Sequence, residues 1–286
     1  MSQATNVRQI GGEKKFPIGK IVLYIVLIAL SAFTLIPFVW MISASLKLDR
    51  EVFTFPMKWI PETFHWENYS LIWSKVPMLT YFKNTAIIAI CVTFIQTLTS
   101  SFAAYAFAKL RFKGRNVLFM AYISTIAVPW QAYMLPQFIL MRSFGLYDRL
   151  LAIMVLQAFS AFGVFLMRQF YQNIPNELCE AARIDGLSEY GIWARIMLPL
   201  STAAIATLVI FTFVGTWNDY MGPMIYLTRE ENKTIQIGLR RFIQENSSDY
   251  HLIMAASVVS LLPVSIVFLA LQRYFIEGIA TSGLKG

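Results

Sequence analysis

Charged side chains are scarce in this sequence. Of its 286 residues only 14% are Asp, Glu, Lys or Arg, whereas 57% are hydrophobic, and the mean hydropathy is positive. A water-soluble fold of this composition would have to bury almost every side chain it contains. The composition therefore indicates a membrane protein.

Histidine and cysteine are also rare, with two of each. Cys91 lies inside a long apolar run and Cys179 in a polar segment, so we expect no disulfide between them, and two cysteines alone do not make a metal site. His65 and His251 both lie in segments between apolar runs and have no metal-ligand spacing. We therefore expect neither a metal centre nor the catalytic cluster of a membrane enzyme.

Two further patterns are missing from the sequence. No Gly-rich loop with P-loop spacing occurs, so the chain is not expected to hydrolyse ATP by that mechanism. The net charge of +8 is not arranged as a basic stripe interleaved with aromatic residues, so we expect no binding to nucleic acid. Lys and Arg that flank membrane spans, next to anionic lipids, explain the charge.

Long apolar runs are what the sequence does contain. A helix needs about 20 apolar residues to cross a bilayer, and six runs reach or approach that length. We expect an all-α membrane protein with six transmembrane helices, at about 21–42, 84–108, 117–141, 150–168, 199–221 and 252–273.

An even number of spans places both chain ends on the same side of the membrane. The first apolar run has no small-residue cleavage site, so it is expected to be a retained span and not a signal peptide. Lys and Arg cluster in the N-terminal tail, 1–20, and again in the loop 109–115. The positive-inside rule then predicts cytoplasmic tails at 1–20 and 276–286 and an extracytoplasmic segment at 43–83, although the total Lys and Arg counts on the two sides differ little.

The third apolar run contains Pro129 and Pro136, each of which removes a backbone donor. A helix broken at membrane depth is tolerated where neighbouring protein or a wet cavity satisfies the freed carbonyls. We expect either a kinked helix that packs on its neighbours or part of a substrate pathway. Gln96 and Gln157, also within the spans, are expected to form hydrogen bonds between helices. The candidate pathway residues are Trp130, Gln131, Tyr133 and, at the end of the fifth span, Asn218.

A polar segment, "ELCEAARIDGLSEYGIWARIMLPL" from Glu177 to Leu200, separates two of these apolar runs. Glu177 and Glu180 fall in the first turns of a helix, where the helix dipole favours carboxylates. Gly186 is suited to a left-handed helix end, and Ser188 can cap a second helix. The segment 175–198 therefore predicts a short helix, a sharp turn and a second short helix held against the membrane, which is compatible with a coupling device or with an ordinary amphipathic loop.

The spacing of this segment also matches a known motif. Glu180, Ala181 and Ala182 are followed by three residues, Gly186, nine residues, and then "IMLP". This pattern resembles the EAA motif of the permease subunits of ATP-binding-cassette (ABC) importers. Other segments, among them "VPWQAYMLPQFILMRSFGLYD" and "TWNDYMGPMIYL", are similar to the carbohydrate-importer branch of that family, and the resemblance extends over the chain from Ile21 onward.

The resemblance implies a type I importer fold, with a transmembrane domain over 84–275 and a cytoplasmic coupling helix between the fourth and fifth spans. It implies a second homologous permease subunit, two ATPase subunits that bind ATP and Mg²⁺, an extracytoplasmic solute-binding protein and a sugar as substrate, in a bacterial or archaeal cytoplasmic membrane. This chain itself is then no enzyme and holds no cofactor. The C-terminal "SGLKG" departs from the family's usual ending, which leaves contact of this tail with the ATPase open. The residues implied to dock on the ATPase are Glu180, Ala181, Ala182, Asp185 and Gly186.

The alternative is an ion-coupled secondary transporter. Such carriers usually place ionisable side chains inside their spans, and the runs between their bounding charges contain none. The sequence thus favours the ATP-driven class. The substrates compatible with the resemblance are disaccharides, oligosaccharides, polyols and glycerol phosphate.

Overall fold

The computed structural model describes residues 18–243 and 249–283, and the regular structure of this part of the chain is helical. Most of the N-terminal tail expected at 1–20 lies outside the described residues, as do 244–248 and 284–286. The helices are α1 (Ile18–Ser45), α2 (Asp49–Val52), α3 (Asn68–Lys75), α4 (Met78–Lys109), α5 (Arg115–Ser124), α6 (Trp130–Ser143), α7 (Leu150–Leu156), α8 (Ala161–Gln172), α9 (Asn176–Ile184), α10 (Glu189–Ile192), α11 (Leu198–Leu200), α12 (Thr202–Trp217), α13 (Met221–Tyr226), α14 (Ile235–Arg240) and α15 (Tyr250–Gly283).

Three of these helices are long and apolar enough to cross a membrane by themselves: α1, α4 and α15. With 32 residues, α4 is about 48 Å long, since an α-helix rises 1.5 Å per residue. It begins at Met78, six residues before the expected start at 84, and α15 continues to Gly283, well into the segment expected to be a tail. Apolar patterning located these helices but not their ends, where polar residues continue the helix into the interface.

The three remaining expected spans are not single straight helices. Each is a pair of helices bent at a short break: by 100° between α5 and α6, by 45° between α7 and α8, and by 83° between Glu189–Leu200 and α12. If each pair counts as one span, the described residues contain up to six. The helix expected at 117–141 is broken next to Pro129, as the prolines of this run allow, whereas the single helix expected at 150–168 is corrected to a broken one and the helix expected at 199–221 to α12, which ends at Trp217.

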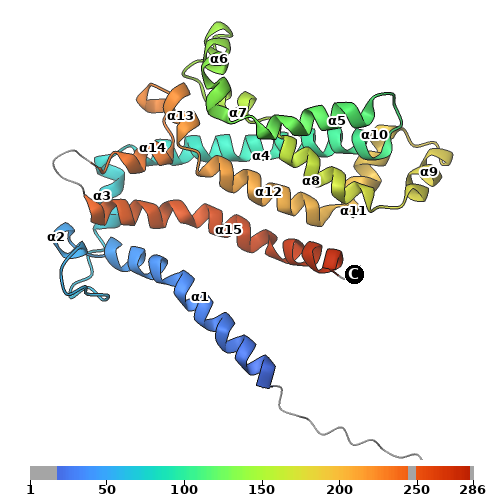
Figure 1. The fold of residues 1–286 in the computed structure, drawn as a ribbon. Coiled ribbons are helices and arrows are strands. Elements are labelled where there is room, and N and C mark those ends of the chain that lie inside the picture. The colour runs from blue at the N-terminus through green and yellow to red at the C-terminus, as the bar shows by residue number, and fades with distance from the viewer. Residues whose placement is uncertain (1–17, 244–248, 284–286) are drawn as a thin grey trace, which may run out of the picture.

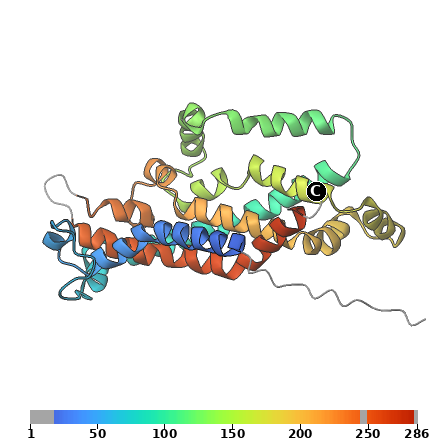
Figure 2. The ribbon, with the colours of Figure 1, turned by 60° about the horizontal axis from the view of Figure 1, so that its bottom comes forward.

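The centre of the bundle is α4, which packs against α8 on one side and α12 on another, while α12 packs against α15 (Figure 1). The approach to α8 is close because Gly163 has no side chain: a Cβ there would lie 2.5 Å from the Ser100 Oγ. Small residues allow helices in membranes to approach in this way. Figure 2 shows α5 on the outside of the bundle, beyond α8.

The first helix stands apart from this bundle. Most of its apolar stretch is exposed, although Ser43, Ala44 and Ser45 at its end are buried, and beyond its contact with α15 it leaves that helix at an angle (Figure 1). Its last turn is better anchored, because the side-chain amide of Asn68 donates to the backbone carbonyls of Ser45 and Lys47, both at 2.9 Å. The exposed remainder of α1 is an apolar surface suited to lipid or to another membrane subunit.

The start of α1 and the end of α15 both lie toward the end of the bundle that holds α9 and α10, whereas α2 and α3 lie at the opposite end (Figure 1). The polar segment, the start of α1 and the end of α15 are thus on the same side. The side of the membrane on which this end lies follows from the partner that contacts the polar segment.

Asp148 ties the loop after α6 to the loop after α13. Its backbone has φ +59°, and its carboxylate accepts hydrogen bonds from the backbone N–H groups of Thr228 (2.8 Å) and Arg229 (3.0 Å) and from the Arg229 guanidinium (2.5 Å). Burial alone would raise the pKa of this carboxyl, but these donors outweigh it and hold the pKa well below the usual range. Asp148 is therefore a charged anchor between two connections far apart in the chain.

Replacement of this anchor should destabilise the protein in a pH-dependent way. A carboxyl whose pKa is lowered by folding adds stability above its ordinary pKa, near 3.8, and this stability is lost as the pH falls toward the folded-state value. In detergent, Asp148→Asn should melt a few degrees below the wild type throughout pH 5–8, and the difference should shrink as the pH falls below about 4 and close only near the folded-state pKa. Asp185→Asn, which removes an exposed carboxylate, is the control and should melt like the wild type. A gap that persists at low pH would show that the lost carboxylate charge is not the cause.

Candidate functional site

The polar segment forms a sharp turn between α9 and α10. Beyond the end of α9, Gly186 adopts φ +85°, a left-handed conformation that side-chain-bearing residues rarely adopt. The Leu187 N–H donates to the Ala182 carbonyl at 2.9 Å, and the Gly186 N–H donates to the Arg183 carbonyl at 3.0 Å. This pair of bonds is a Schellman motif. The turn predicted from Gly186 is confirmed.

The second helix of the segment also begins as predicted, because the Ser188 side chain accepts a hydrogen bond from the Gly191 N–H at 3.3 Å. After α10 the chain continues through one π-helical stretch, Trp193–Met197, and the short α11 before the bend into α12. We refer to residues 176–200 as the coupling segment.

One face of the coupling segment is buried against the helix bundle. Cys179, Ala182, Ile192 and Met197 are each at most 4% exposed and belong to one apolar cluster with Tyr105 of α4, Val164 of α8 and Leu208 of α12. Burial raises the pKa of the Cys179 thiol, so this cysteine is a packing residue in its unreactive form. Ala182, expected in the docking surface, instead faces this core, where its small side chain allows α9 to pack closely.

The opposite face of the coupling segment is exposed. Ile184 is 87% exposed, which is costly for an apolar side chain in water. The exposed residues around the turn also include Glu180, Ala181, Asp185 and Gly186. Four of the five predicted docking residues therefore share one accessible surface, and Ile184, which the sequence motif did not single out, lies among them.

Polar contacts join the coupling segment to the end of α4. Glu189 accepts hydrogen bonds from Arg183 (Nε at 2.6 Å) within the segment and from the Tyr105 hydroxyl of α4. The Lys109 ammonium, at the last residue of α4, donates to the Ile174 carbonyl and, at 2.8 Å, to the Asn176 side chain. Both ends of α9 are thus held to α4, so a force on the turn acts on a long central helix.

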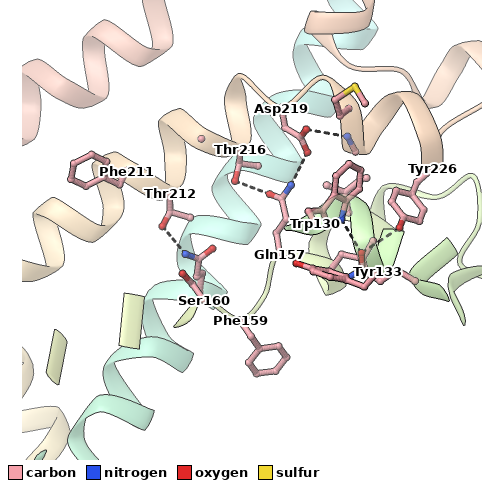
Figure 3. A pocket seen from close by; sticks show the side chains of 17 residues that line it. Trp130, Tyr133, Gln157, Phe159, Ser160, Phe211, Thr212, Thr216, Asp219 and Tyr226 are labelled. Carbon is pink, nitrogen blue, oxygen red and sulfur yellow. Dashed lines mark hydrogen bonds between the residues drawn. The ribbon is translucent and has the colours of Figure 1, made fainter. Parts of the chain in front are cut away.

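A second site lies at the breaks in the helices. It is a cavity of about 490 Å³, here termed the inner cavity (Figure 3). Its wall combines the start of α6, the break between α7 and α8, the middle of α4 and the last turns of α12. A volume of this size is within the usual range for small-molecule sites. The polar lining residues include Gln96, Gln137, Gln157, Thr212, Thr216 and Asp219.

Hydrogen bonds organise the wall of the inner cavity. The Gln157 amide donates to Asp219 Oδ2 at 2.8 Å and accepts from the Thr216 hydroxyl at 2.9 Å (Figure 3). The other Asp219 oxygen accepts from the Gly222 N–H at 3.1 Å. These contacts fasten the α7–α8 break to the end of α12, because Gln157 caps α7 and Asp219 follows α12.

The predicted pathway residues divide into two pairs. Trp130 and Tyr133 line the inner cavity, and the Trp130 indole donates to the Gln137 amide at 3.0 Å. Gln131 and Asn218 are exposed and are not part of the lining; Asn218 accepts a hydrogen bond from Gln236 at 3.2 Å instead.

Three residues that line the inner cavity were not predicted to be pathway residues: Asp219, Gln96 and Gln157. Asp219 lies one residue beyond Asn218, at the end of the fifth apolar run, a position typical of an interfacial helix end, yet it lines the cavity. The interhelical hydrogen bonds expected for Gln96 and Gln157 are confirmed, since Gln96 donates to Thr212 at 3.1 Å, but both side chains also line the cavity. The feature of the sequence that could have indicated the cavity is the pair of amide side chains, Gln96 and Gln157, within two different apolar runs.

Within 18–243 and 249–283, no three His, Cys, Asp or Glu side chains gather in a way that could hold a metal ion. The two sites are an exposed turn at one end of the bundle and a polar cavity among broken apolar helices, and their side chains are suited to contact and recognition. Together they define a multi-pass membrane protein of the transport class.

Comparison with known proteins identifies the family. Residues 96–281 match the model of the binding-protein-dependent transport system inner membrane component, and the chain belongs to this family of ABC transporter permeases. Its members are membrane subunits of transport systems and not catalytic enzymes. This membership supports ATP-driven transport over the ion-coupled alternative.

Curated relatives agree with this assignment. The chain is 34% identical to the arabinooligosaccharides transport system permease protein AraQ of Halalkalibacterium halodurans, over 79% of this chain and 81% of that one. It is 31% identical to the lactose transport system permease protein LacG of Rhizobium radiobacter (92% and 95%). It is 32% identical to the sn-glycerol-3-phosphate transport system permease protein UgpE of Yersinia pestis (86% and 90%).

A solved structure has the same fold. It is a crystal structure of a bacterial ABC transporter involved in the import of the acidic polysaccharide alginate, with a TM-score of 0.79, 26% identity, and coverage of 92% of this chain and 98% of that one. The relatives thus include transporters named for neutral saccharides, for a phosphate ester and for a polyuronate.

The contact of Glu189 with Arg183 and Tyr105 can be tested in solution. Glu189→Gln removes the charge, which should loosen the coupling segment: backbone amides of 179–188 should exchange hydrogen up to about fivefold faster, because a partly exposed charged pair contributes at most about 1 kcal/mol. Hydrogen-exchange mass spectrometry of the purified protein measures this. Glu177→Gln, in the exposed first turn of α9, is the matched control. Equal exchange in all three proteins would show that Glu189 does not hold the segment.

Proposed function

We propose that the chain is a permease subunit of an importer that carries a sugar, or a related polyol or glycerol phosphate, across the cytoplasmic membrane of a bacterium or archaeon. In this proposal it pairs with a second homologous permease, receives substrate from an extracytoplasmic solute-binding protein and is driven by two ATPase subunits, which bind ATP and Mg²⁺. The names of the relatives support the substrate class.

The observation that carries the proposal is the two-faced coupling segment. Its outer face exposes Ile184, Asp185 and a left-handed glycine turn, whereas its inner face is packed on α4, α8 and α12. A partner that inserts the turn into a cleft would gain apolar burial from Ile184, and it could pair a cationic side chain with Glu180 or Asp185. We assign this partner as the cytoplasmic ATPase.

Movement of the turn would reach the membrane region through α4. Closure of the ATPase pair around ATP would displace the coupling segment, and the Glu189–Tyr105 and Lys109–Asn176 contacts would pass that displacement to the end of α4. Because α4 is one continuous helix of 32 residues, its far parts must move with its end. In this way the spans would alternate between inward-facing and outward-facing arrangements.

The proposed contact with a cytoplasmic ATPase also determines how the chain is oriented in the membrane. If the turn contacts a cytoplasmic ATPase, the start of α1 and the end of α15, which lie toward the same end of the bundle (Figure 1), are cytoplasmic as well. The basic loop after α4, with Arg111 and Arg115, is also at this end, in agreement with the positive-inside rule. The segment 43–83 is then extracytoplasmic.

Two glycines make a matched test of the ATPase contact. Gly186→Val places a β-branched side chain at φ +85°, and Gly145→Val does the same at φ +67° in the turn after α6, where an equivalent pair of hydrogen bonds links Gly145 to Arg142 and Leu146 to Met141. A Cβ at either position meets no atom within 4 Å. Both variants should therefore lose about the same stability, of order 1–2 kcal/mol.

Only Gly186→Val should uncouple the transporter. Binding-protein-stimulated ATP hydrolysis and co-purification of the ATPase with the permease should fall at least about tenfold in this variant, as expected for loss of about 1.4 kcal/mol or more of contact energy. Gly145→Val should retain both activities at matched temperature. Equal losses in the two variants, or normal assembly and hydrolysis in Gly186→Val, would contradict the assignment.

A further inference from the structure

We infer that the inner cavity is a saccharide subsite of this chain that accepts uncharged sugar units and selects against anionic ones. The inference rests on the proposed function and narrows its substrate class. It depends on three features of the cavity wall: its aromatic surfaces, its hydrogen-bonding groups and its charge.

Aromatic rings provide flat apolar surfaces around the cavity. Trp130 and Tyr133 come from α6, Phe159 from the α7–α8 break and Phe211 from α12 (Figure 3). Phe159 is 70% exposed and Phe211 53% exposed, so their rings are accessible. The C–H faces of a pyranose or furanose ring are apolar, and they gain from contact with such rings while the sugar hydroxyls stay free for hydrogen bonds.

The polar groups of the wall are suited to hydroxyl groups. A saccharide hydroxyl donates one hydrogen bond and accepts others, so it fits side chains that do both. Gln96 and Gln157 each offer two amide hydrogens and a carbonyl oxygen. Within the described part of the chain, the amide nitrogen of each donates one hydrogen bond, to Thr212 and to Asp219 respectively. Ser160 adds a hydroxyl beside them.

The charge of the cavity wall favours neutral sugars over anionic ones. Asp219 is a carboxylate, and among the described residues that line the cavity there is no Lys, Arg or His. A phosphate or a uronate needs cationic or convergent N–H donors to offset its loss of hydration. Beside the Asp219 carboxyl, whose two oxygens already accept from Gln157 and Gly222, an anion would meet further acceptors in place of donors and would be disfavoured. A neutral saccharide has no such penalty, and its hydroxyls can donate to Asp219.

The test measures ligand protection of a cysteine placed in the wall. Gly215→Cys, a lining position on α12 where a Cβ meets no atom within 4 Å, is introduced into a background in which Cys91 and Cys179 are replaced by Ala, and the complete transporter is reconstituted in proteoliposomes without ATP. The rate of maleimide labelling is then measured with lactose, arabinotriose, sn-glycerol 3-phosphate or an unsaturated diuronate at millimolar concentration. Lactose or arabinotriose should slow labelling about threefold at twice its dissociation constant, and the two anionic probes should leave the rate unchanged.

Three variants test whether the protection arises from binding at the wall of the inner cavity. Asp219→Asn keeps the shape of the side chain but removes the charge, so the affinity for the neutral probe should fall by no more than one hydrogen bond, about 1 kcal/mol or about fivefold, and protection by an anionic probe should appear. Gln157→Leu should abolish protection. Gln131→Leu, an equivalent change on an exposed amide one residue from Trp130, should leave it intact, and melting temperatures verify that each variant is folded.

Three results would overturn the inference: protection by the anions equal to or greater than that by the sugars, protection by no probe, or protection that survives Gln157→Leu. Failure of the proposed function is distinguishable, because labelling needs no ATP hydrolysis. Loss of coupling would appear in the Gly186→Val and Gly145→Val comparison while protection stays as expected.

Discussion

A polypeptide in the hydrocarbon layer must satisfy its backbone hydrogen bonds internally, and a helix that breaks there frees groups that lipid cannot satisfy. Three of the helical segments described above are bent by 45° or more at short breaks. At the α7–α8 break, the Thr99 hydroxyl donates to the Ala158 carbonyl at 2.8 Å, and the Ser160 side chain accepts from the Gly163 N–H at 3.0 Å. The breaks thus require polar side chains at a depth where they are otherwise costly, and Ser160 is also part of the wall of the inner cavity.

The contacts that hold α9 in place also distinguish its inner face from its outer face. Its last carbonyls accept hydrogen bonds from the turn through Gly186, and its beginning is held to α4 by Lys109, which donates to the Ile174 carbonyl and to the Asn176 side chain. Because these contacts hold both ends of α9, the exposed side chains of Ile184 and Asp185 are not needed to keep it in place. The outer face can therefore bind a partner without disturbing the fold, whereas the inner face, with Ala182 and Ile192, is already packed against the bundle.

Much of this arrangement could be predicted from sequence, and the exceptions have physical causes. Apolar run length located the spans, and Pro129, Gly186 and Ser188 indicated the break before α6 and the turn of the coupling segment, because each residue type acts on the backbone next to it. The α7–α8 break was not predicted, since no proline or glycine marks it and it depends on the distant Asp219 and Thr216. The burial of Ala182 and the exposure of Ile184 could not be read from the motif, which specifies spacing but not which side of α9 meets the bundle.

The two sites are joined by one helix. Tyr105, which bonds Glu189, and Gln96, which lines the inner cavity, are both on α4, and nine residues of α-helix separate them by about 13 Å. A helix of this length bends little, so a tilt imposed at Tyr105 must change the position of Gln96 relative to its partner Thr212 on α12. The contacts that shape the cavity are hydrogen bonds between different helices, and each contributes only about 1 kcal/mol. They are therefore strong enough to define one arrangement of the wall and weak enough to exchange when α4 moves, so that a sugar hydroxyl can replace a side chain at Gln96, Gln157 or Asp219.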